Sequence, residues 1–280
     1  MATSGRTVNT DAAARRGPTR HARDQAQIER LRDVGYVVVP DFIPRERLAG
    51  LKESARQQLA QRAAPRELEA DIQYPGAPSS RDAPGGDTVR RLLDAYGRDA
   101  RFAQEATAPL LRQWMSRYFH EPVRMSRVHH NCLMTKHPRY GSETGWHRDI
   151  RYWAFDREEL VSAWLALGDE NAENGGLRFV PGSHRMRLAA GQFDAASFFR
   201  TDLPQNADIL GTAQVLQLAA GDAVFFHCSL LHSAGSNGSQ AVKFSLVFTY
   251  HGVSNAPISG TRSASMPEIT LDEDRWSFGQ

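Results

Sequence analysis

Two histidines and an aspartate are the residues of this chain best suited to metal chemistry. His147 and Asp149 stand two positions apart, and His232 follows after a long gap. In an extended segment residues two apart point to the same side, so His147 and Asp149 can bind one ion while Arg148 faces elsewhere. Two imidazoles and one carboxylate occupy one face of ferrous iron and leave positions open for oxygen and a substrate. The spacing predicts a metal site, with a surface loop as the alternative, because the pair alone is a weak motif.

Short motifs around these residues make the prediction of a metal site more specific. They are Trp146, Asn174-Gly175-Gly176-Leu177, Pro181-Gly182-Ser183-His184, Gly221-Asp222, Phe225-Phe226-His227 and the run from His232 to Asn237, after an opening segment from Gly35 to Pro40. In this order the chain resembles the phytanoyl-CoA dioxygenase family of non-haem iron oxygenases that consume 2-oxoglutarate. The resemblance runs from about Ile28 to His251. Glycine and proline in the second and third motifs also have a structural reason, since they form tight turns.

The resemblance implies both a fold and a reaction. The fold is mainly β with flanking α-helices, a double-stranded β-helix or cupin-like jelly-roll barrel. His147, Asp149 and His232 would bind Fe(II), and O2 would oxidise a small organic substrate while 2-oxoglutarate is decarboxylated to succinate and CO2. In related halogenases a small residue replaces the carboxylate ligand. Asp149 therefore favours hydroxylation or desaturation.

The expected anchor for 2-oxoglutarate departs from the family pattern. The family usually places an arginine eleven residues after the second histidine ligand, where this chain has Lys243. An ammonium is a compact point charge and lacks the planar fork with which arginine holds a carboxylate. Only three of the 34 basic residues are lysines, so arginine would be the expected residue at this position. We keep 2-oxoglutarate as the co-substrate and Lys243 as its anchor, with a different oxo acid or a lost co-substrate as the alternatives.

Further residues lie where the family gathers groups that contact the oxo acid or the substrate. For the co-substrate they are Asn131, Lys136, Trp164 and Ser245; for the substrate they are Arg148, Arg151, Tyr152 and Trp153. A solvated lysine and a core tryptophan are the alternatives for Lys136 and Trp164.

Periodicity supports this fold. From Ala241 to His251 apolar residues alternate with polar ones, which predicts a strand with one face toward a core and one toward a polar interior or solvent. Helical spacing is expected over residues 26–34, 44–59, 88–100 and 108–119. The glycine- and proline-rich stretch from Tyr74 to Asp87 predicts a loop that acts as a lid or simply lies on the surface.

Composition bounds the function classes. The 280 residues suit a single jelly-roll domain over residues 26–252, with a flexible tail at 1–25 and an extension at 253–280. A net charge of +2 with dispersed arginines argues against nucleic-acid binding, and no apolar run is long enough to span a membrane. Two distant cysteines predict reduced thiols in a cytoplasmic protein. We expect this protein to be a monomer or a homodimer.

Two other functions stay open. The first is a metal-binding jelly roll without oxygenase activity, a ligand sensor or degenerate enzyme, which the lysine at position 243 motivates. The second is a zinc hydrolase that uses the same three ligands, for which Glu143 is the nearby general-base candidate.

Overall fold

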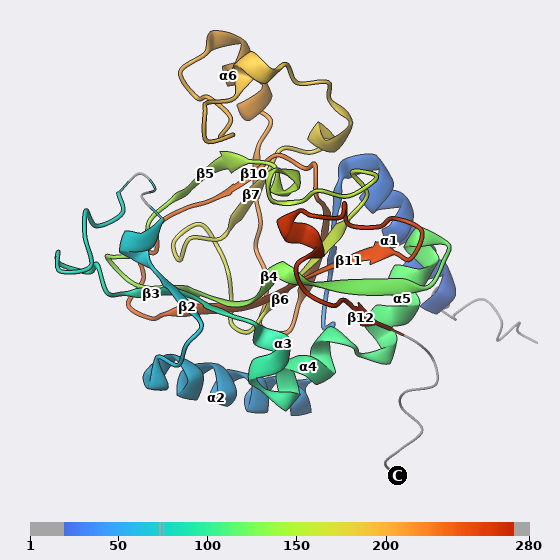
Figure 1. The fold of residues 1–280 in the computed structure, drawn as a ribbon, viewed down its shortest axis with the longest axis horizontal. Coiled ribbons are helices and arrows are strands. Elements are labelled where there is room, and N and C mark those ends of the chain that lie inside the picture. Colours follow the sequence, from blue (N-terminus) through green and yellow to red (C-terminus); the bar gives the residue numbers. More distant parts are fainter. Residues whose placement is uncertain (1–19, 73, 75, 272–280) are drawn as a thin grey trace, which may run out of the picture.

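Two antiparallel β-sheets form the framework of the molecule, and a group of helices covers the larger one (Figure 1). The computed structural model describes residues 20–72, 74 and 76–271. The strands of the larger sheet, in spatial order, are β1 (Tyr36–Val39), β9 (Ala223–His227), β6 (Val161–Ala166), β11 (Lys243–Gly252), β4 (Val123–Lys136), β3 (Val89–Leu93) and β2 (Arg66–Leu68), with β12 (Ile269–Thr270) beside β4. The smaller sheet consists of β5 (Thr144–His147), β10 (His232–Ala234), β7 (Leu177–Phe179) and β8 (Gln214–Val215).

The helices lie mostly on the outer face of the larger sheet. They are α1 (Arg20–Val34), α2 (Arg45–Gln61), α3 (Ala95–Arg98), α4 (Ala100–Ala106), α5 (Pro109–Phe119) and α6 (Pro204–Leu210). The main apolar core joins α1, α2, α4 and α5 to this face, where the ring of Trp114 lies 4.4 Å from that of Phe225. A second apolar cluster fills the space between the two sheets and includes Val224, Val247 and Phe179. Mainly β structure with helices on one sheet confirms the predicted fold class.

Strand β11 shows how the sequence pattern becomes two environments. Leu246 and Phe248 belong to the core under the helices, whereas Lys243, Ser245 and Val247 line a cavity between the sheets. Successive side chains of a strand point to opposite faces, so the alternation in sequence separates core from cavity. The polar face of this strand lies inside the molecule, as predicted.

Our prediction of a helix over residues 88–100 is wrong. Residues Val89–Leu93 form β3, and only short helices follow it. In β3, Arg91 pairs with Met134 and Leu92 with Leu133 of β4. Pairing with a long neighbouring strand satisfies the backbone of this segment and buries Leu92, which outweighs its local helical preference.

The two ends of the chain depart partly from our expectations. Helix α1 begins at Arg20, inside the segment predicted as a flexible tail, and the rest of that tail lies outside the described residues. After residue 252 the chain forms a bridge between Pro257 and Phe155 and then returns to the larger sheet, where β12 pairs with β4 and Glu268 Oε1 lies 2.6 Å from His251 Nε2. Within residues 20–271, as far as they are described, we find no helix long and apolar enough to cross a membrane.

Candidate metal centre

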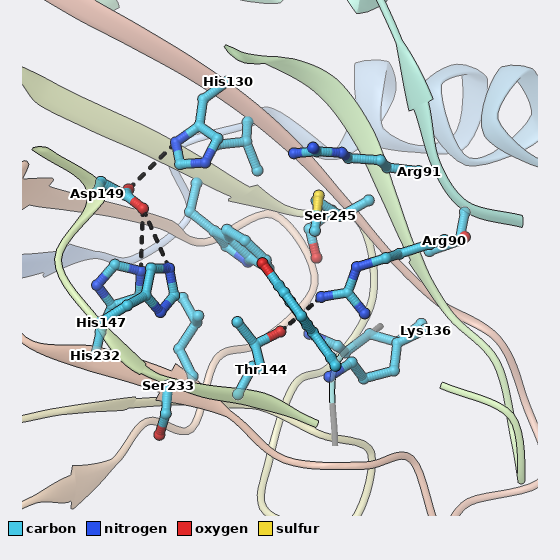
Figure 2. Close-up of a pocket in the computed structure, with 18 of the residues that line it drawn as sticks. Arg90, Arg91, His130, Lys136, Thr144, His147, Asp149, His232, Ser233 and Ser245 are labelled. Carbon is cyan, nitrogen blue, oxygen red and sulfur yellow. Dashed lines mark hydrogen bonds and ion pairs between the residues drawn. The ribbon is translucent and has the colours of Figure 1, made fainter. Parts of the chain in front are cut away.

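Strand register brings the two distant histidines together. In the antiparallel pair of β5 and β10, His147 and His232 stand directly opposite each other, and their ring centroids are 4.2 Å apart. Asp149 follows β5 by two residues and begins the 3-10 helix η3 (Asp149–Tyr152). One ligand atom from each of the three residues lies within 4.8 Å of the others (Figure 2). The sheet thus closes the long sequence gap between the candidate ligands.

Both imidazoles are oriented for metal binding by hydrogen bonds to the backbone. Nδ1 of His147 lies 2.9 Å from the carbonyl oxygen of Gly145, and Nδ1 of His232 lies 2.9 Å from that of Leu230. A ring that donates from Nδ1 keeps its lone pair on Nε2. Each Nε2 lies 3.4 Å from the same oxygen, Oδ1 of Asp149. Three donor atoms therefore face one point.

The burial of these groups tests whether a metal ion fits. Asp149 is fully buried, and neither of its carboxylate oxygens has a hydrogen-bond partner. A buried carboxylate that accepts no hydrogen bond of good geometry is costly even with imidazole nitrogens 3.2 to 3.4 Å away, and a divalent cation removes that cost. Burial, together with the nearby His232, lowers the pKa of His147 to about 4, so this imidazole is neutral near pH 7 as a metal ligand must be. Burial opposes the charge on Asp149, but His130 and His232 outweigh it and hold the pKa of Asp149 well below its usual value. The residues fit a divalent metal ion.

A third histidine approaches the same carboxylate from the other side. Nδ1 of His130, on β4, lies 3.2 Å from Oδ2 of Asp149. It therefore contacts the oxygen that does not face the two imidazoles. Sequence reasoning set His130 aside because no carboxylate stands two residues away from it. Only the packing of β4 against η3 reveals the contact.

A narrow cavity of about 80 Å³ extends from the triad between the two sheets. Figure 2 shows the three ligands at one end, with Arg90, Arg91 and Lys136 on the opposite side. Four of the five residues predicted to contact the co-substrate line this cavity: Lys136, Trp164, Lys243 and Ser245.

Asn131 is placed differently from our expectation. Its side-chain oxygen accepts a hydrogen bond from the backbone N–H of Tyr96 at 2.8 Å, and its amide nitrogen donates to Oδ1 of Asp94 at 2.9 Å. These contacts tie the start of α3 to β4. Asn131 therefore serves packing between these elements rather than the co-substrate site that we expected, because its side chain is directed to the helix-bearing side.

Lys243, the expected anchor, already has a partner. Its Nζ donates to Oε2 of Glu170 at 2.7 Å, and both side chains are buried. Ser245 Oγ and Trp164 Nε1 donate to the other oxygen of Glu170, at 2.6 and 2.9 Å. Sequence reasoning missed Glu170, because an acidic residue in a turn after a strand is normally solvated.

Two arginines of β3 add positive charge to the cavity, and both carry acidic partners. Arg90 donates to Oγ1 of Thr144 at 2.8 Å and to Oε2 of Glu69 at 3.3 Å. Arg91 donates to Oε2 of Glu67 at 2.8 Å. These residues were missed because we expected a helix here. If the apolar positions in this segment had been interpreted as a strand, one of the two arginines would have been predicted on the inner face of the sheet.

Two tyrosines contribute to the lining of the cavity. Tyr74, from the glycine- and proline-rich stretch, and Tyr152 both line it, and their hydroxyl oxygens are 3.3 Å apart. Of the four residues predicted to meet the substrate, Tyr152 is the one that lines this cavity. Arg148 instead donates to the carbonyl oxygen of Ser183 at 2.7 Å, and Arg151 and Trp153 line a separate surface groove.

Comparison with known proteins settles the family. Residues 31–245 match the phytanoyl-CoA dioxygenase family, which is most of the chain. The chain belongs to the phytanoyl-CoA dioxygenase family. The chain is 26% identical over 217 residues to L-proline trans-4-hydroxylase of Streptomyces griseoviridis, an alignment that covers 68% of this chain and 80% of that protein. It is 23% identical over 249 residues to ectoine dioxygenase of Stutzerimonas stutzeri, with 82% and 77% covered.

Solved structures of other proteins have the same fold. The epimerase SnoN from nogalamycin biosynthesis, solved with Fe3+, alpha ketoglutarate and nogalamycin RO, gives a TM-score of 0.69 at 22% identity and covers 91% of this chain and 98% of its own. EctD from S. alaskensis, solved with 2-oxoglutarate and 5-hydroxyectoine, gives a TM-score of 0.68 at 21% identity, with 83% and 77% covered. The predicted jelly-roll barrel of the dioxygenase family is confirmed.

Proposed function

We propose that this chain is a non-haem Fe(II)- and 2-oxoglutarate-dependent dioxygenase that hydroxylates or desaturates a small organic substrate. The observation that carries the proposal is the convergence of His147, Asp149 and His232 at the end of a cavity that also contains Lys136 and Lys243. Family membership supports the reaction class, and relatives named for oxidation of proline and ectoine support a small substrate.

The three ligands would hold ferrous iron, which supplies oxygen activation and the oxidative decarboxylation of 2-oxoglutarate when bound. The chain contributes orientation. The backbone carbonyls of Gly145 and Leu230 fix both imidazole rings, and burial between two sheets excludes bulk water from the reacting end.

The co-substrate would lie between the metal and the basic side of the cavity. Lys136 supports this placement, because its buried ammonium contacts only the carbonyl oxygens of Ser142 and Gly235 and forms no ion pair with a carboxylate in the described part of the chain. Trp164, Lys243 and Ser245 complete this side, although Glu170 shares their hydrogen bonds. A cavity of about 80 Å³ favours a small substrate, since drug-sized ligands occupy ~300 Å³ or more.

Tyr74 and Tyr152, which both line the cavity, would contact the substrate. The ring of Tyr74 also lies under the guanidinium of Arg90, with 4.7 Å between Cζ and the ring centroid. These contacts support a lid function for the stretch from Tyr74 to Asp87, because Tyr74 links its start to Tyr152 and Arg90 of the cavity lining.

Succinate formation tests the proposal. Purified protein with ferrous iron, ascorbate and 2-oxoglutarate should form succinate slowly without a substrate, and His147→Ala should abolish that turnover. His21→Ala is the matched control, since His21 is exposed on α1. Turnover that persists in His147→Ala at the same metal content would refute the proposed site.

The second candidate is a metal-binding jelly roll without oxygenase activity, which the pairing of Lys243 with Glu170 favours. The same assay separates the two functions. Stoichiometric metal binding that depends on Asp149, without succinate in the wild type, would support the binding protein.

We further propose a cytoplasmic location and a monomeric or homodimeric state. The two cysteines, Cys132 and Cys228, are both buried and free, which supports a reducing compartment. Size-exclusion chromatography with light scattering tests the oligomeric state.

A further inference from the structure

Glu170 places a carboxylate directly behind three side chains that line the cavity where the co-substrate is expected. Three side chains expected around the co-substrate, Lys243, Ser245 and Trp164, all donate hydrogen bonds to it, at distances of 2.6 to 2.9 Å. Glu170 is 1% exposed. Each of the side chains expected to recognise a dicarboxylate therefore already donates one hydrogen bond to a residue of the chain itself.

The backbone holds Glu170 in this position. The backbone N–H of Glu170 donates to the carbonyl oxygen of Leu218, and the backbone N–H of Leu218 donates to the carbonyl oxygen of Glu170, both at 2.9 Å. This two-way bridge fixes Cα of Glu170 against the opposite segment. Burial, three hydrogen bonds to the carboxylate and the backbone bridge together hold Glu170 beside Lys243.

The electrostatic consequence concerns oxo acids with a second carboxylate. Lys243 and Glu170 together carry no net charge, so the ammonium no longer offers an unpaired cation. A carboxylate that approaches Lys243 also approaches the carboxylate of Glu170, and two like charges in a desolvated site repel each other. Lys136 is the other buried lysine of the cavity, and its partners in the described chain are neutral carbonyls.

We propose that Glu170 is a specificity-determining residue of the co-substrate site, which weakens the selection for a distal carboxylate by pairing with Lys243. The inference rests on the proposed function, because it assumes that an oxo acid binds the metal in this cavity. It predicts that the wild type distinguishes poorly between 2-oxoglutarate and 2-oxopentanoate, in which a methyl group replaces the distal carboxylate.

The test is calorimetric titration of both oxo acids into protein loaded with Mn(II), which measures binding without turnover. In the wild type we expect 2-oxoglutarate to bind less than about tenfold tighter than 2-oxopentanoate. Glu170→Gln keeps an acceptor for Ser245 and Trp164 but frees Lys243, so the preference for 2-oxoglutarate should rise about tenfold to a hundredfold. The gain should vanish in Glu170→Gln combined with Lys243→Met. Glu173→Gln, three residues away and exposed, is the matched control and should leave the preference unchanged.

The outcomes separate this inference from the proposed function. A preference of about a hundredfold or more in the wild type would overturn the inference, and this measurement does not depend on any variant folding. An unchanged preference in folded, metal-loaded Glu170→Gln would overturn it as well. If neither oxo acid binds the metal-loaded wild type, the proposed function itself fails, and the inference fails with it.

Discussion

Replacing Lys136 with methionine should stabilise the protein below pH 7, although Lys136 is expected to bind the co-substrate. Burial, reinforced by the positive charges of Arg90 and Lys243, lowers the pKa of Lys136 from 10.5 to about 7. Glu69 and Glu143 offset only part of this effect. A fall of this size corresponds to a cost of about 5 kcal/mol for keeping the ammonium charged in the folded protein. Methionine has a similar length and carries no charge.

The sign of the pH dependence follows from proton binding. Between pH 7 and 10.5 the unfolded chain keeps the proton on Lys136 and the folded protein releases it, so the stability of the wild type rises with pH across this window. The full cost is present below pH 7. Methionine also loses the hydrogen bonds to the carbonyl oxygens of Ser142, at 3.2 Å, and Gly235, at 2.5 Å. At about 1 kcal/mol each, these losses leave a net gain of about 3 kcal/mol near pH 6, which falls to about zero near pH 9.

Urea unfolding at pH 6 and pH 9, without oxo acid, measures this gain for Lys136→Met. Lys52→Met is the control, because Lys52 lies partly exposed on α2. A second series with saturating 2-oxoglutarate should show a larger ligand stabilisation in the wild type than in Lys136→Met. A variant that is less stable than the wild type at pH 6, or whose advantage does not change with pH, would refute the electrostatic reasoning.

Three further predictions concern the fold and the metal. Gly35→Ala should lower stability by about 2 to 4 kcal/mol in urea unfolding, because φ is +87° and Cβ would lie 2.5 Å from Nδ1 of His184; a neutral effect would contradict this. Ser183→Ala should cost about 1 to 3 kcal/mol, since its Oγ accepts from the buried N–H of Leu231 at 2.8 Å, and unchanged urea midpoints would argue against it. Co(II) at a hundred times its Kd for the wild type should stabilise the wild type by about 3 kcal/mol in thermal unfolding, and a chelator should reverse this stabilisation. Equal stabilisation of Asp149→Ala at the same Co(II) concentration would exclude this carboxylate as a ligand.

Much of this protein was readable from the sequence alone. The alternation in β11 separated the core from the cavity, because side chains in a strand alternate with period two. The pair His147 and Asp149 indicated a metal, because a short spacing fixes relative position almost independently of the rest of the chain. Both patterns depend on residues close together in the sequence, and for that reason both could be interpreted without the tertiary structure.

Tertiary structure alone decided what lies opposite these residues. The register of β5 and β10 sets His232 against His147, and the packing of a turn against β11 brings Glu170 to Lys243. A sequence gives the charge of Glu170 but not its burial, and burial makes this acid the partner of Lys243 rather than a solvated surface group. Contacts between segments far apart in the chain depend on the simultaneous packing of all the strands, so no spacing rule predicts them.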